Sequence, residues 1–592
     1  MAAVIAPRLE WHLPEPIVEP PRFAGFAAPV ATLLARRGFR TDDEVARFLE
    51  AGVGTMHPIA LMADAEAALD RIDHAIAGGE QIAIWGDYDA DGISAIAVWV
   101  LGLRTLGIEP EPERYVPSRW SEGYGLSRVG LEALAERGVR LVITCDCGIA
   151  NVAEVDIARS LGLDVIVTDH HLPGPMLPRA AAVVDPHRAD CSYPDSDLTG
   201  AGLAFKLATA LLARRGLSAP DLAGVAAIGT IADLAPMTGE SRAIVRIGLE
   251  ELAASTRPGL RALVAASASD PDNPTVRDLG YTIAPRINAA GRIAEAELAL
   301  RLLVSDDEEE AARLIGELDS VHERRRELTA AALAEARALV DGKTSENGPV
   351  LLRKDSWAPG IIGLIAGRLA DELARPVGVV CAVEDELRGS VRAPQDFHVA
   401  AALEACAGLL TKRGGHAAAG GFSLMEGNWI AFQAAFGTLP RPYPPGLASR
   451  AERAGQLAID LVLPASRVDW ALAAQLERLR PYGPGNVEPV LAITGMHVAE
   501  ARRVGATEAH MSFRMRRGLA TFDAVAFATP AERPLPAAGD ALDLVGTLER
   551  DTFQGIERLR LRVTDYTHSE ASPLLARRLP RTPASPQLAA VG

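Results

Sequence analysis

The stretch Ile82-Ala-Ile-Trp-Gly-Asp-Tyr-Asp-Ala-Asp-Gly92 places three carboxylates directly after a short apolar run. If the chain is still extended there, Asp87, Asp89 and Asp91 alternate onto one face and converge on a small volume. Such a cluster repels itself unless a cation neutralises it, so this is the best metal-site candidate in the chain. A calcium EF-hand loop opens with the same spacing but needs Glu at its twelfth position, where this chain has Val98. The EF-hand interpretation therefore fails.

From Gln81 to about Asp185, short apolar runs alternate with amphipathic stretches. This alternation is typical of βαβ units and predicts an α/β fold with a mostly parallel sheet. Ligands bind such sheets outside the carboxyl ends of the strands, which is where the polar clusters fall. The expected strands are 82–85, 114–116, 141–145, 165–168 and 181–184, and the expected helices are 93–106, 127–137 and 152–161.

Asp146 follows the third expected strand in Ile143-Thr-Cys-Asp-Cys-Gly148. Taken alone, a strand-end Asp is more often a cap or turn residue than a ligand. Cys145 and Cys147 are spaced by one residue without a second pair, which is a poor zinc pattern, so we expect them to pack as small apolar residues.

Asp169, His170 and His171 follow the fourth expected strand, and two adjacent histidines after an acid favour chemistry over a structural role. Because consecutive side chains diverge, one ring is expected to bind a metal while the other faces a substrate oxygen. Asp233 ends an apolar segment, and a cap or exposed turn explains it as well as a metal does.

The rest of the chain divides into three parts. A charged stretch from Asp306 to Asp341 predicts one long solvated helix of the kind that bridges domains. A second α/β unit follows at about 348–439, and then short strand signals after a Pro-rich breaker suggest a small β-barrel, with an OB-fold as the first choice. The barrel strands are expected at 457–463, 490–494, 511–515, 524–528, 542–548 and 557–563, with a helix at 470–479.

Composition sets the broad class of the protein. The 592 residues are 48% hydrophobic, enough for several domains, and no apolar run is long enough to cross a bilayer. No signal peptide pattern is visible, and five cysteines suggest a reducing compartment, so the cytoplasm is expected. The net charge of −17 would repel nucleic acid overall, but a cleft can still carry local positive potential.

Four motifs in this order resemble the DHH phosphoesterase superfamily: Asp87-Tyr-Asp-Ala-Asp-Gly92, Cys145-Asp-Cys-Gly148, Asp169-His-His171 and Thr230-Ile-Ala-Asp233. Further stretches are similar to one branch of it, the RecJ family of single-strand-specific 5′→3′ DNA exonucleases. These stretches are Arg119–Gly125, Gly200–Lys206, Pro285–Arg292, Gly389–Arg392, Gly414–Gly421 and Pro481–Asn486. The resemblance covers roughly 82–566. Ala358 and Ala393 depart from the usual family pattern near the expected end-recognition region.

The resemblance implies a bilobed DHH core with a C-terminal OB-like β-barrel. An N-terminal segment would span 1–75, a parallel-sheet DHH catalytic domain 76–304, a linker helix 305–342, a DHH-associated substrate-binding α/β domain 343–440 and the OB-fold 448–566. The composition of 567–592 suggests a disordered tail.

The resemblance also implies two divalent cations, with Mn²⁺ preferred because of the mixed His and carboxylate set and Mg²⁺ as the alternative. The implied ligands are Asp89, Asp91, Asp146, His170 and Asp233, with Asp87 as a further ligand or supporting group. Asp146 is expected to bridge the cations, and His171 to lie near the scissile phosphate as a catalytic group. Such a cation pair activates water for in-line attack on phosphorus.

An exonuclease that reads an end also needs a pocket for the terminal phosphate. Ser390 and Arg392 are two residues apart in an expected strand, which places a hydroxyl and a guanidinium on one face. Gly415 permits close backbone approach to a ligand, although tight packing explains it equally well. The other family-matched substrate contacts are Arg119, Tyr124, Arg286, Asn288, Arg292 and His416. In the barrel, Phe513, Phe522, Phe527 and Phe553 could stack on bases, although core packing explains most of them better.

The predicted function is therefore a single-strand-specific 5′→3′ DNA exonuclease that releases 5′-mononucleotides in DNA repair and recombination. The expected partners are single-stranded DNA with a 5′ end, a single-strand-binding protein and a helicase, with no membrane and a monomeric state. One alternative is a DHH phosphoesterase for short oligonucleotides or cyclic dinucleotides, which usually lacks the barrel. Another is a non-catalytic replication scaffold, which predicts eroded ligands, whereas every expected acid and both histidines are present.

Overall fold

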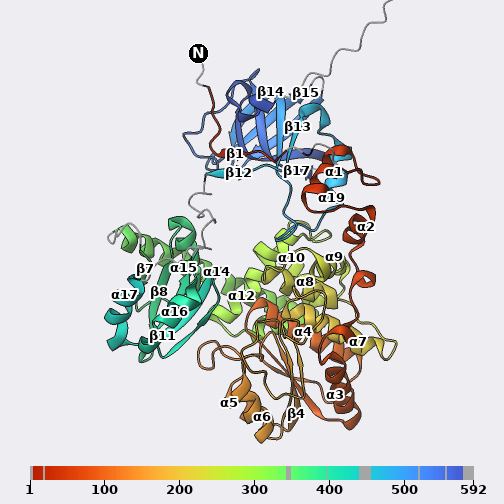
Figure 1. The fold of residues 1–592 in the computed structure, drawn as a ribbon, viewed down its shortest axis with the longest axis vertical. Coiled ribbons are helices and arrows are strands. Elements are labelled where there is room, and N and C mark those ends of the chain that lie inside the picture. Colours follow the sequence, from red (N-terminus) through yellow and green to blue (C-terminus); the bar gives the residue numbers. More distant parts are fainter. Residues whose placement is uncertain are drawn as a thin grey trace, which may run out of the picture. The chain divides into compact units, whose positions relative to one another are not determined.

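The computed structural model describes residues 4–15, 17, 21–341, 348–394, 397–438, 455–517, 520–553 and 556–577, which fall into two units (Figure 1). The described parts of 50–450, together with 481–487, form a two-lobed unit. The described parts of 1–49, 451–480 and 488–592 form a second unit, called the barrel unit below.

The first lobe is built on a five-stranded parallel sheet of order β3-β2-β4-β5-β6, as the alternating pattern predicts. Gly86 pairs with Cys145, so β2 and β4 end side by side in the middle of the sheet. Acids that follow these two strands are thereby brought to one edge of the sheet. The strands are β2 (Gln81–Gly86), β3 (Glu113–Tyr115), β4 (Val139–Cys145), β5 (Asp164–Thr168) and β6 (Ala182–Val184).

Helices cover both faces of this sheet. Helix α4 is apolar on all sides and buried from Ala90 to Leu103, because α7, α8, α12 and α13 surround it. Helices α5 and α6 pack on the opposite face. The helices of this lobe are α3 (Ala65–Gly78), α4 (Ala90–Thr105), α5 (Arg128–Glu136), α6 (Val152–Ser160), α7 (Gly200–Ala213), α8 (Leu222–Ala232), α9 (Gly239–Ala254), α10 (Pro258–Ser267), α11 (Val276–Asp278), the π-helical turn η3 (Leu279–Ile283), α12 (Ala284–Ile293) and α13 (Glu297–Val304), with 3-10 turns η1 (Val53–Thr55) and η2 (Ile59–Leu61).

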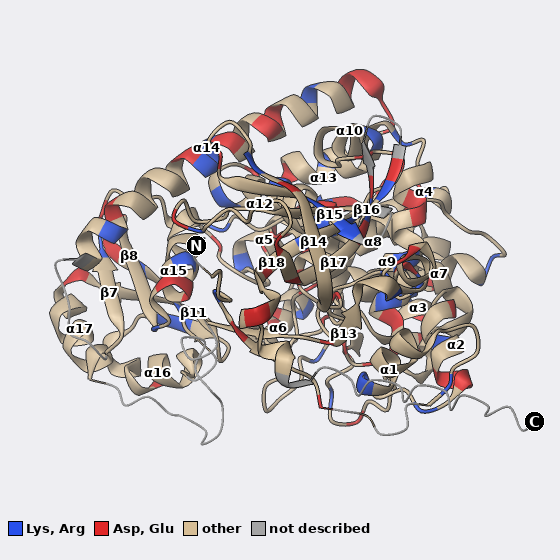
Figure 2. Ribbon diagram, turned by 90° about the horizontal axis from the view of Figure 1, so that it is seen from above, with Lys and Arg blue, Asp and Glu red and all other residues tan. Residues whose placement is uncertain are grey.

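The long helix α14 (Glu308–Asp341) links the two lobes, as predicted. Its first half buries Leu314 and Leu318 in the core of the first lobe, and its second half buries Leu333 and Ala336 against the second lobe. Acidic and basic residues alternate along the rest of its surface (Figure 2). This arrangement explains why the helix is polar over most of its circumference yet stable.

The second lobe carries a mixed five-stranded sheet of order β10-β11-β9-β8-β7, in which only β7 and β8 are parallel. Its strands are β7 (Val350–Arg353), β8 (Val377–Val383), β9 (Glu386–Arg392), β10 (Lys412–Gly415) and β11 (Ala419–Met425). Its helices are α15 (Pro359–Leu373), α16 (Val399–Ala405) and α17 (Trp429–Gly437), with 3-10 turns η4 (Ala407–Leu409) and η5 (Glu426–Asn428).

The barrel unit is a sheet closed on itself, because β14 pairs with both β15 and β17. An N-terminal strand pairs with β12, and the buried Asp565 carboxylate accepts hydrogen bonds from Arg8 N, Leu9 N and Trp11 Nε1. The strands are β1 (Glu10–His12), β12 (Gln456–Ala458), β13 (Leu461–Pro464), β14 (Leu491–Val504), β15 (His510–Arg517), β16 (Ala520–Ala526), β17 (Ala541–Phe553) and β18 (Ile556–His568). The helices are α1 (Ala28–Arg36), α2 (Asp42–Glu50), α19 (Trp470–Glu477) and the 3-10 turns η6 (Ala465–Arg467), η7 (Ser569–Ala571) and η8 (Pro573–Arg577).

Two expectations for this part of the chain were wrong. The apolar stretch 457–463 forms two short strands, since β12 pairs with the N-terminal strand and β13 with β14. The tail expected to be disordered is folded through residue 577, because β18 extends to His568 and Leu574 packs beside Trp11. Residues 578–592 lie outside the described residues. No helix in the described ranges has the length and apolarity needed to cross a membrane.

Candidate metal centre

The three acids after β2 do not lie on an extended strand, which corrects the local geometry expected from their spacing. Asp89 is the N-cap of α4, and its Oδ1 accepts hydrogen bonds from Asp91 N at 2.9 Å and Gly92 N at 3.2 Å. Asp91 lies in the first turn of the helix. The chain turns this early because an Asp before a helix-forming run satisfies the free amides of the first turn. Asp87 and Asp91 therefore reach the site from different directions.

The carboxylate of Asp91 lies at the N-terminus of α7. Its Oδ2 accepts a hydrogen bond from Gly200 N at 2.7 Å, and its Oδ1 accepts one from Ala201 N at 3.0 Å. A Cβ at Gly200 would lie 2.4 Å from the Cβ of Asp146, so only glycine lets α7 approach this closely. The amides of α7 hold Asp91 in place, a role that sequence spacing gave no means of assigning.

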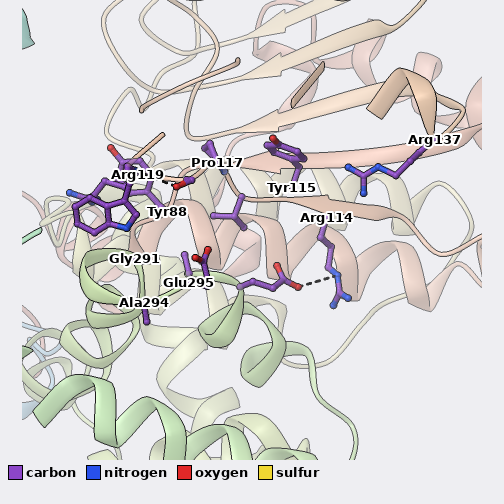
Figure 3. Close-up of a pocket in the computed structure, with 14 residues that line it drawn as sticks. Tyr88, Arg114, Tyr115, Pro117, Arg119, Arg137, Gly291, Ala294 and Glu295 are labelled. Carbon is purple, nitrogen blue, oxygen red and sulfur yellow. Dashed lines mark hydrogen bonds and ion pairs between the residues drawn. The ribbon is translucent and has the colours of Figure 1, made fainter. Parts of the chain in front are cut away.

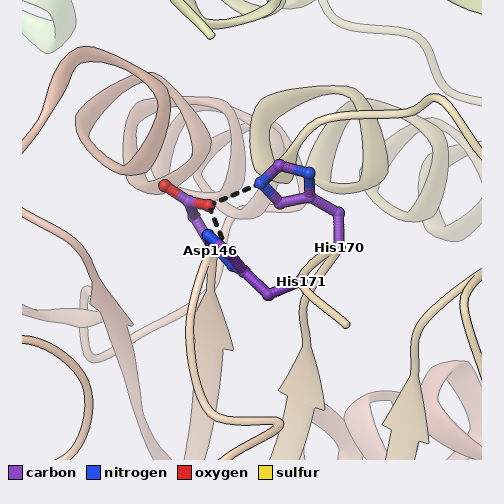
Figure 4. A group of neighbouring side chains, drawn as sticks. All are labelled: Asp146, His170 and His171. Atoms are coloured by element: carbon purple, nitrogen blue, oxygen red, sulfur yellow. Dashed lines mark hydrogen bonds and ion pairs between the residues drawn. The ribbon is translucent and has the colours of Figure 1, made fainter. Parts of the chain in front are cut away.

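Asp146 leaves the carboxyl end of β4 with a φ of 60°, a backbone conformation that residues other than glycine seldom adopt. His170 Nε2 lies 2.9 Å from its Oδ1, and both His170 and His171 point toward this carboxylate from the loop after β5 (Figure 4). The prediction that the two rings diverge was therefore wrong. The cap or turn interpretation of Asp146 also loses support, since its side chain faces the histidines.

Asp169 fixes both histidines, and sequence reasoning assigned it no role. Its Oδ1 accepts hydrogen bonds from His170 N at 2.8 Å and His171 Nδ1 at 2.7 Å, while its Oδ2 accepts one from Ile149 N at 2.9 Å. Burial opposes a charge on His171, but the hydrogen bond and charge of Asp169 raise the pKa of this imidazole to about 9. Burial and the neighbouring His171 lower the pKa of His170 to about 4. The pKa of His170 therefore lies below that of His171, which suits His170 to bind a cation as a neutral ligand.

Side chains from four parts of the chain form three overlapping groups, and within each group the ligand atoms lie within 4.8 Å of one another. Asp146 and His170 each belong to two of these groups. Asp233, at the end of α8, joins through an oxygen 3.9 Å from His170 Nε2. The groups are Asp146, His170 and His171; Asp91, His170 and Asp233; and Asp87, Asp89 and Asp146.

The electrostatics of the cluster call for cations. Burial and the charge of Asp89 raise the pKa of Asp87 well above its ordinary value, and burial and Asp91 do the same to Asp146. Burial and the charge of Asp233 raise the pKa of Asp91 to about 8. Asp87 Oδ1 is buried and has no hydrogen-bond partner among the described residues. Carboxylates that repel one another and an imidazole that is neutral fit a pair of divalent cations of the Mn²⁺ or Mg²⁺ type.

The second lobe contributes to the surroundings of this cluster. His416 follows β10, and its ring faces that of His171 with centroids 6.1 Å apart and an interplanar angle of 14°. Tyr124 OH donates a hydrogen bond to Asp146 O at 2.9 Å and lies 3.1 Å from His171 Nδ1. The candidate centre is therefore bordered by both lobes.

Comparison with known proteins identifies each part of this arrangement. Residues 81–230 match the DHH family N-terminal domain, 347–438 the DHHA1 domain and 459–565 the RecJ OB domain. The single-stranded-DNA-specific exonuclease RecJ of Bacillus subtilis is 33% identical over 555 residues, covering 91% of this chain and 68% of the relative. The chain belongs to the RecJ family.

Solved RecJ structures agree with the fold. The structure of RecJ in complex with Mn²⁺ from Thermus thermophilus superposes with a TM-score of 0.76 at 32% identity, covering 94% of this chain and 79% of that one. The Mg²⁺ complex of the same protein gives a TM-score of 0.70 at 30% identity, covering 95% and 78%. Both cations named for these RecJ structures are those that suit the donor set described above.

Several residues expected to bind RecJ substrate form a cluster of arginines that have no ion pair with an acid among the described residues. Arg392 and Ser390 share a face of β9 as predicted, with Arg392 Nη1 2.9 Å from Ser390 Oγ. Arg119 lies over the ring of Tyr88, with Cζ 3.9 Å from the ring centroid. Burial and then the charges of Arg119, Arg325 and Arg392 lower the pKa of Arg292 to about 10. Guanidiniums that repel one another in this way suit an anion such as phosphate.

Three other residues expected to contact substrate make contacts within the protein instead. Arg286 donates from Nε to Asp319 and from its other nitrogens to Thr282 O and Ala266 O, so its role is to join α12 to its neighbours, and we withdraw it as a substrate contact. Asn288 Oδ1 accepts a hydrogen bond from Ala90 N, which ties α12 to the start of α4. Gly415 has a φ of 141°, and a Cβ there would lie 2.4 Å from Ala419 O, so packing explains this glycine.

The phenylalanines of the barrel unit differ in their exposure to solvent. Phe513 is buried, whereas Phe527 is half exposed and open to contact. Phe522 is partly buried, and the side chain of Phe553 lies outside the described residues. Cys145 and Cys147 are buried free thiols, which confirms their packing role.

Proposed function

We propose that this chain is a single-stranded-DNA-specific exonuclease that degrades strands from a 5′ end and releases 5′-mononucleotides with two divalent cations. The observation that carries the proposal is the gathering of acids and histidines from β2, β4, β5 and α8 into overlapping groups around Asp146. RecJ relatives are named as single-strand-specific DNA exonucleases, which supports this substrate. A RecJ OB domain match argues against a phosphoesterase restricted to very short substrates.

The cations would be held by a mixed set of carboxylates and one imidazole: Asp89, Asp91, Asp146, His170 and Asp233, with Asp87 as a further ligand. When bound, they supply activation of water and neutralisation of charge at the phosphate. Within this set Asp146 is the proposed bridging carboxylate. The amides of Gly200 and Ala201 orient Asp91, and the glycine keeps α7 close enough to do so.

His171 is the proposed proton donor to the leaving oxygen. Asp169 and Tyr124 occupy its Nδ1 side, and the Asp169 carboxylate favours the imidazolium. Nε2 has no hydrogen-bond partner among the described residues and is free to face a substrate. A positioned acid of this kind contributes roughly 100- to 10,000-fold to a reaction rate.

End recognition is proposed for Arg119, Arg292, Ser390 and Arg392. A cluster of guanidiniums with one hydroxyl suits the two negative charges of a terminal phosphate. Tyr124 and His416 border the same space from the two lobes and would contact the strand near the scissile bond.

We further propose that the protein acts as a cytoplasmic monomer, together with a single-strand-binding protein and a helicase. Five free cysteines support a reducing compartment. An exonuclease specific for single strands needs its substrate to be unpaired. A helicase separates the strands, and a single-strand-binding protein keeps them apart.

The deciding experiment is a time course on single strands labelled at the 5′ or the 3′ end, with Mn²⁺, Mg²⁺ or chelator. The proposal expects immediate release of 5′-labelled mononucleotide, slow loss of the 3′ label and no cleavage with chelator. Duplex DNA of the same sequence should survive. Faster hydrolysis of dinucleotides than of long strands would favour the short-substrate alternative instead.

A further inference from the structure

A separate cavity of about 280 Å³ lies in the first lobe beside the loop that follows β2 and carries Asp87 and Asp89 (Figure 3). It is bounded by β3, the loop that follows β3 and the turn between α12 and α13. Arg119 and Tyr88 line it, whereas Ser390 and Arg392 do not. The cavity is therefore distinct from the space proposed for the terminal phosphate, with Arg119 shared between the two.

The two ends of the cavity differ in chemistry. Figure 3 places Tyr88 and Arg119 toward one end and Arg114 and Arg137 toward the other. Tyr115 and Trp120 are the other aromatic residues of the lining, and the guanidinium of Arg119 lies over the Tyr88 ring with Cζ 3.9 Å from its centroid. Stacked aromatic and guanidinium planes are the surfaces on which nucleobases bind.

The arginines have unused donors. Among the side chains that the structure describes, neither Arg114 nor Arg119 makes a hydrogen bond to a protein acceptor, and Arg119 Nε is buried without a partner. The acid nearest to Arg114 is Glu297, at 3.8 Å, a distance too long for a hydrogen bond. Arg137 uses Nη1 on Glu113 and Nε on Ala133 O. An anion could therefore bind Arg114 and Arg137 without breaking a buried pair.

We infer that this cavity binds a nucleoside 5′-monophosphate, with the base against Tyr88 and Trp120 and the phosphate at Arg114 and Arg137. A ligand with one flat apolar end and one dianionic end matches a cavity with Tyr88 toward one end and Arg114 and Arg137 toward the other. The acids Glu295 and Glu297 in the lining suit the hydroxyl groups of the sugar, which donate hydrogen bonds. The choice of ligand rests on the proposed function, since this class of compound is what the exonuclease would release.

Occupancy of the cavity should slow the enzyme. Tyr88 lies between the metal-ligand candidates Asp87 and Asp89, and Gly291 packs so closely on its carbonyl that a Cβ there would lie 2.2 Å away. A base resting on the Tyr88 ring would restrict this loop directly. The released nucleotide would then limit its own production.

The test is calorimetric titration of the full chain, with chelator present, using 2′-deoxyadenosine 5′-monophosphate. We expect saturable binding that weakens at least about tenfold when 2′-deoxyadenosine replaces the nucleotide, or when Arg114→Gln and Arg137→Gln are combined. Arg159→Gln, on exposed α6 of the same lobe, should bind like the unmodified chain.

Equal binding by the double variant, or equal binding of nucleoside and nucleotide, would overturn the inference. The nuclease assay adds a second arm, in which the double variant should cut at the normal rate and resist inhibition by the nucleotide. Undiminished inhibition of that variant would place the nucleotide at the metal centre and also refute the cavity. If the protein cuts no DNA at all, the proposed function fails while calorimetry still decides whether the cavity binds the nucleotide.

Discussion

His171 of the first lobe and His416 of the second face each other with ring planes 14° apart and centroids 6.1 Å apart. Among the described residues, only one of these rings has a carboxylate partner, since Asp169 accepts a hydrogen bond from His171 Nδ1. The pair marks the position where a phosphodiester would meet groups from both lobes. It also makes the contribution of the second lobe testable by one substitution.

Replacing His416 by Gln should lower kcat for strand cleavage about tenfold to a hundredfold while metal binding persists. Its ring lies beside His171 but in none of the three ligand groups, so the change should affect the substrate and not the cations. Single-turnover cleavage and Mn²⁺ titration of the same variant measure the two effects. Loss of Mn²⁺ binding would contradict this assignment.

Asp146→Asn should reduce cleavage by more than about a hundredfold, because groups that only support a metal ligand already cost 10- to 100-fold when removed. The substitution keeps the shape of the side chain but removes the charge that two ligand groups share. Binding of single-stranded DNA should change little. Mn²⁺-dependent cleavage at the normal rate would refute the bridging role.

Arg392→Gln should reduce kcat/KM on 5′-phosphorylated strands about tenfold to a hundredfold, since a charged hydrogen bond contributes about 1.5–3 kcal/mol. Strands with a 5′-hydroxyl should be cut at the same rate as by the unmodified enzyme. Arg286→Gln provides the contrast, because its nitrogens are bound to α10, η3 and α14. That variant should lose stability and keep its preference for phosphorylated ends.

Metal-free protein should become less stable as pH rises, and cations should reverse this effect. The pKa of Asp91 is raised to about 8, so the folded state holds a proton that the unfolded chain has lost, and stability falls progressively between about pH 4 and 8. The gain in Tm on adding Mg²⁺ should therefore be larger at pH 8 than at pH 6. Asp91→Asn should make the Tm of the metal-free protein depend less on pH. An equal gain at both pH values would contradict the proposed linkage.

Asp565→Ala should destabilise the barrel unit by about 3–5 kcal/mol, the usual cost of leaving one member of a buried ion pair without its partner. The carboxylate lies 3.0 Å from Arg533 Nη2 and also holds Arg8 N, Leu9 N and Trp11 Nε1. Urea unfolding followed by hydrogen exchange of the barrel strands β14 to β18 is the measurement. Glu500→Ala, which removes an exposed acid of β14, should cost less than about 0.5 kcal/mol.

Patterns in the sequence predicted the elements of this protein well where neighbouring residues decide them. Hydrophobic periodicity and short apolar runs located the five strands of the first sheet and the long helix α14. These signals are local, because the buried face of a strand or helix is formed by residues that lie close together in the sequence. The same reasoning failed at Asp87–Asp91, where the helix-capping preference of Asp89 ended the extended chain early. It also failed at 569–577, whose packing against Trp11 depends on a segment more than five hundred residues away.

The sequence by itself determined which chemical groups are available: the acids, the adjacent histidines and their order, and with them the family. Only the tertiary structure decided which groups meet. Arg286 and Arg292 lie on one helix, yet Asp319 holds the first while the second faces other arginines. No sequence pattern marked Asp169 as a positioning residue, and only the structure shows its Oδ1 2.7 Å from His171 Nδ1. Contacts of this kind form between segments far apart in the chain, so their geometry depends on how sheets and helices pack and not on any local pattern.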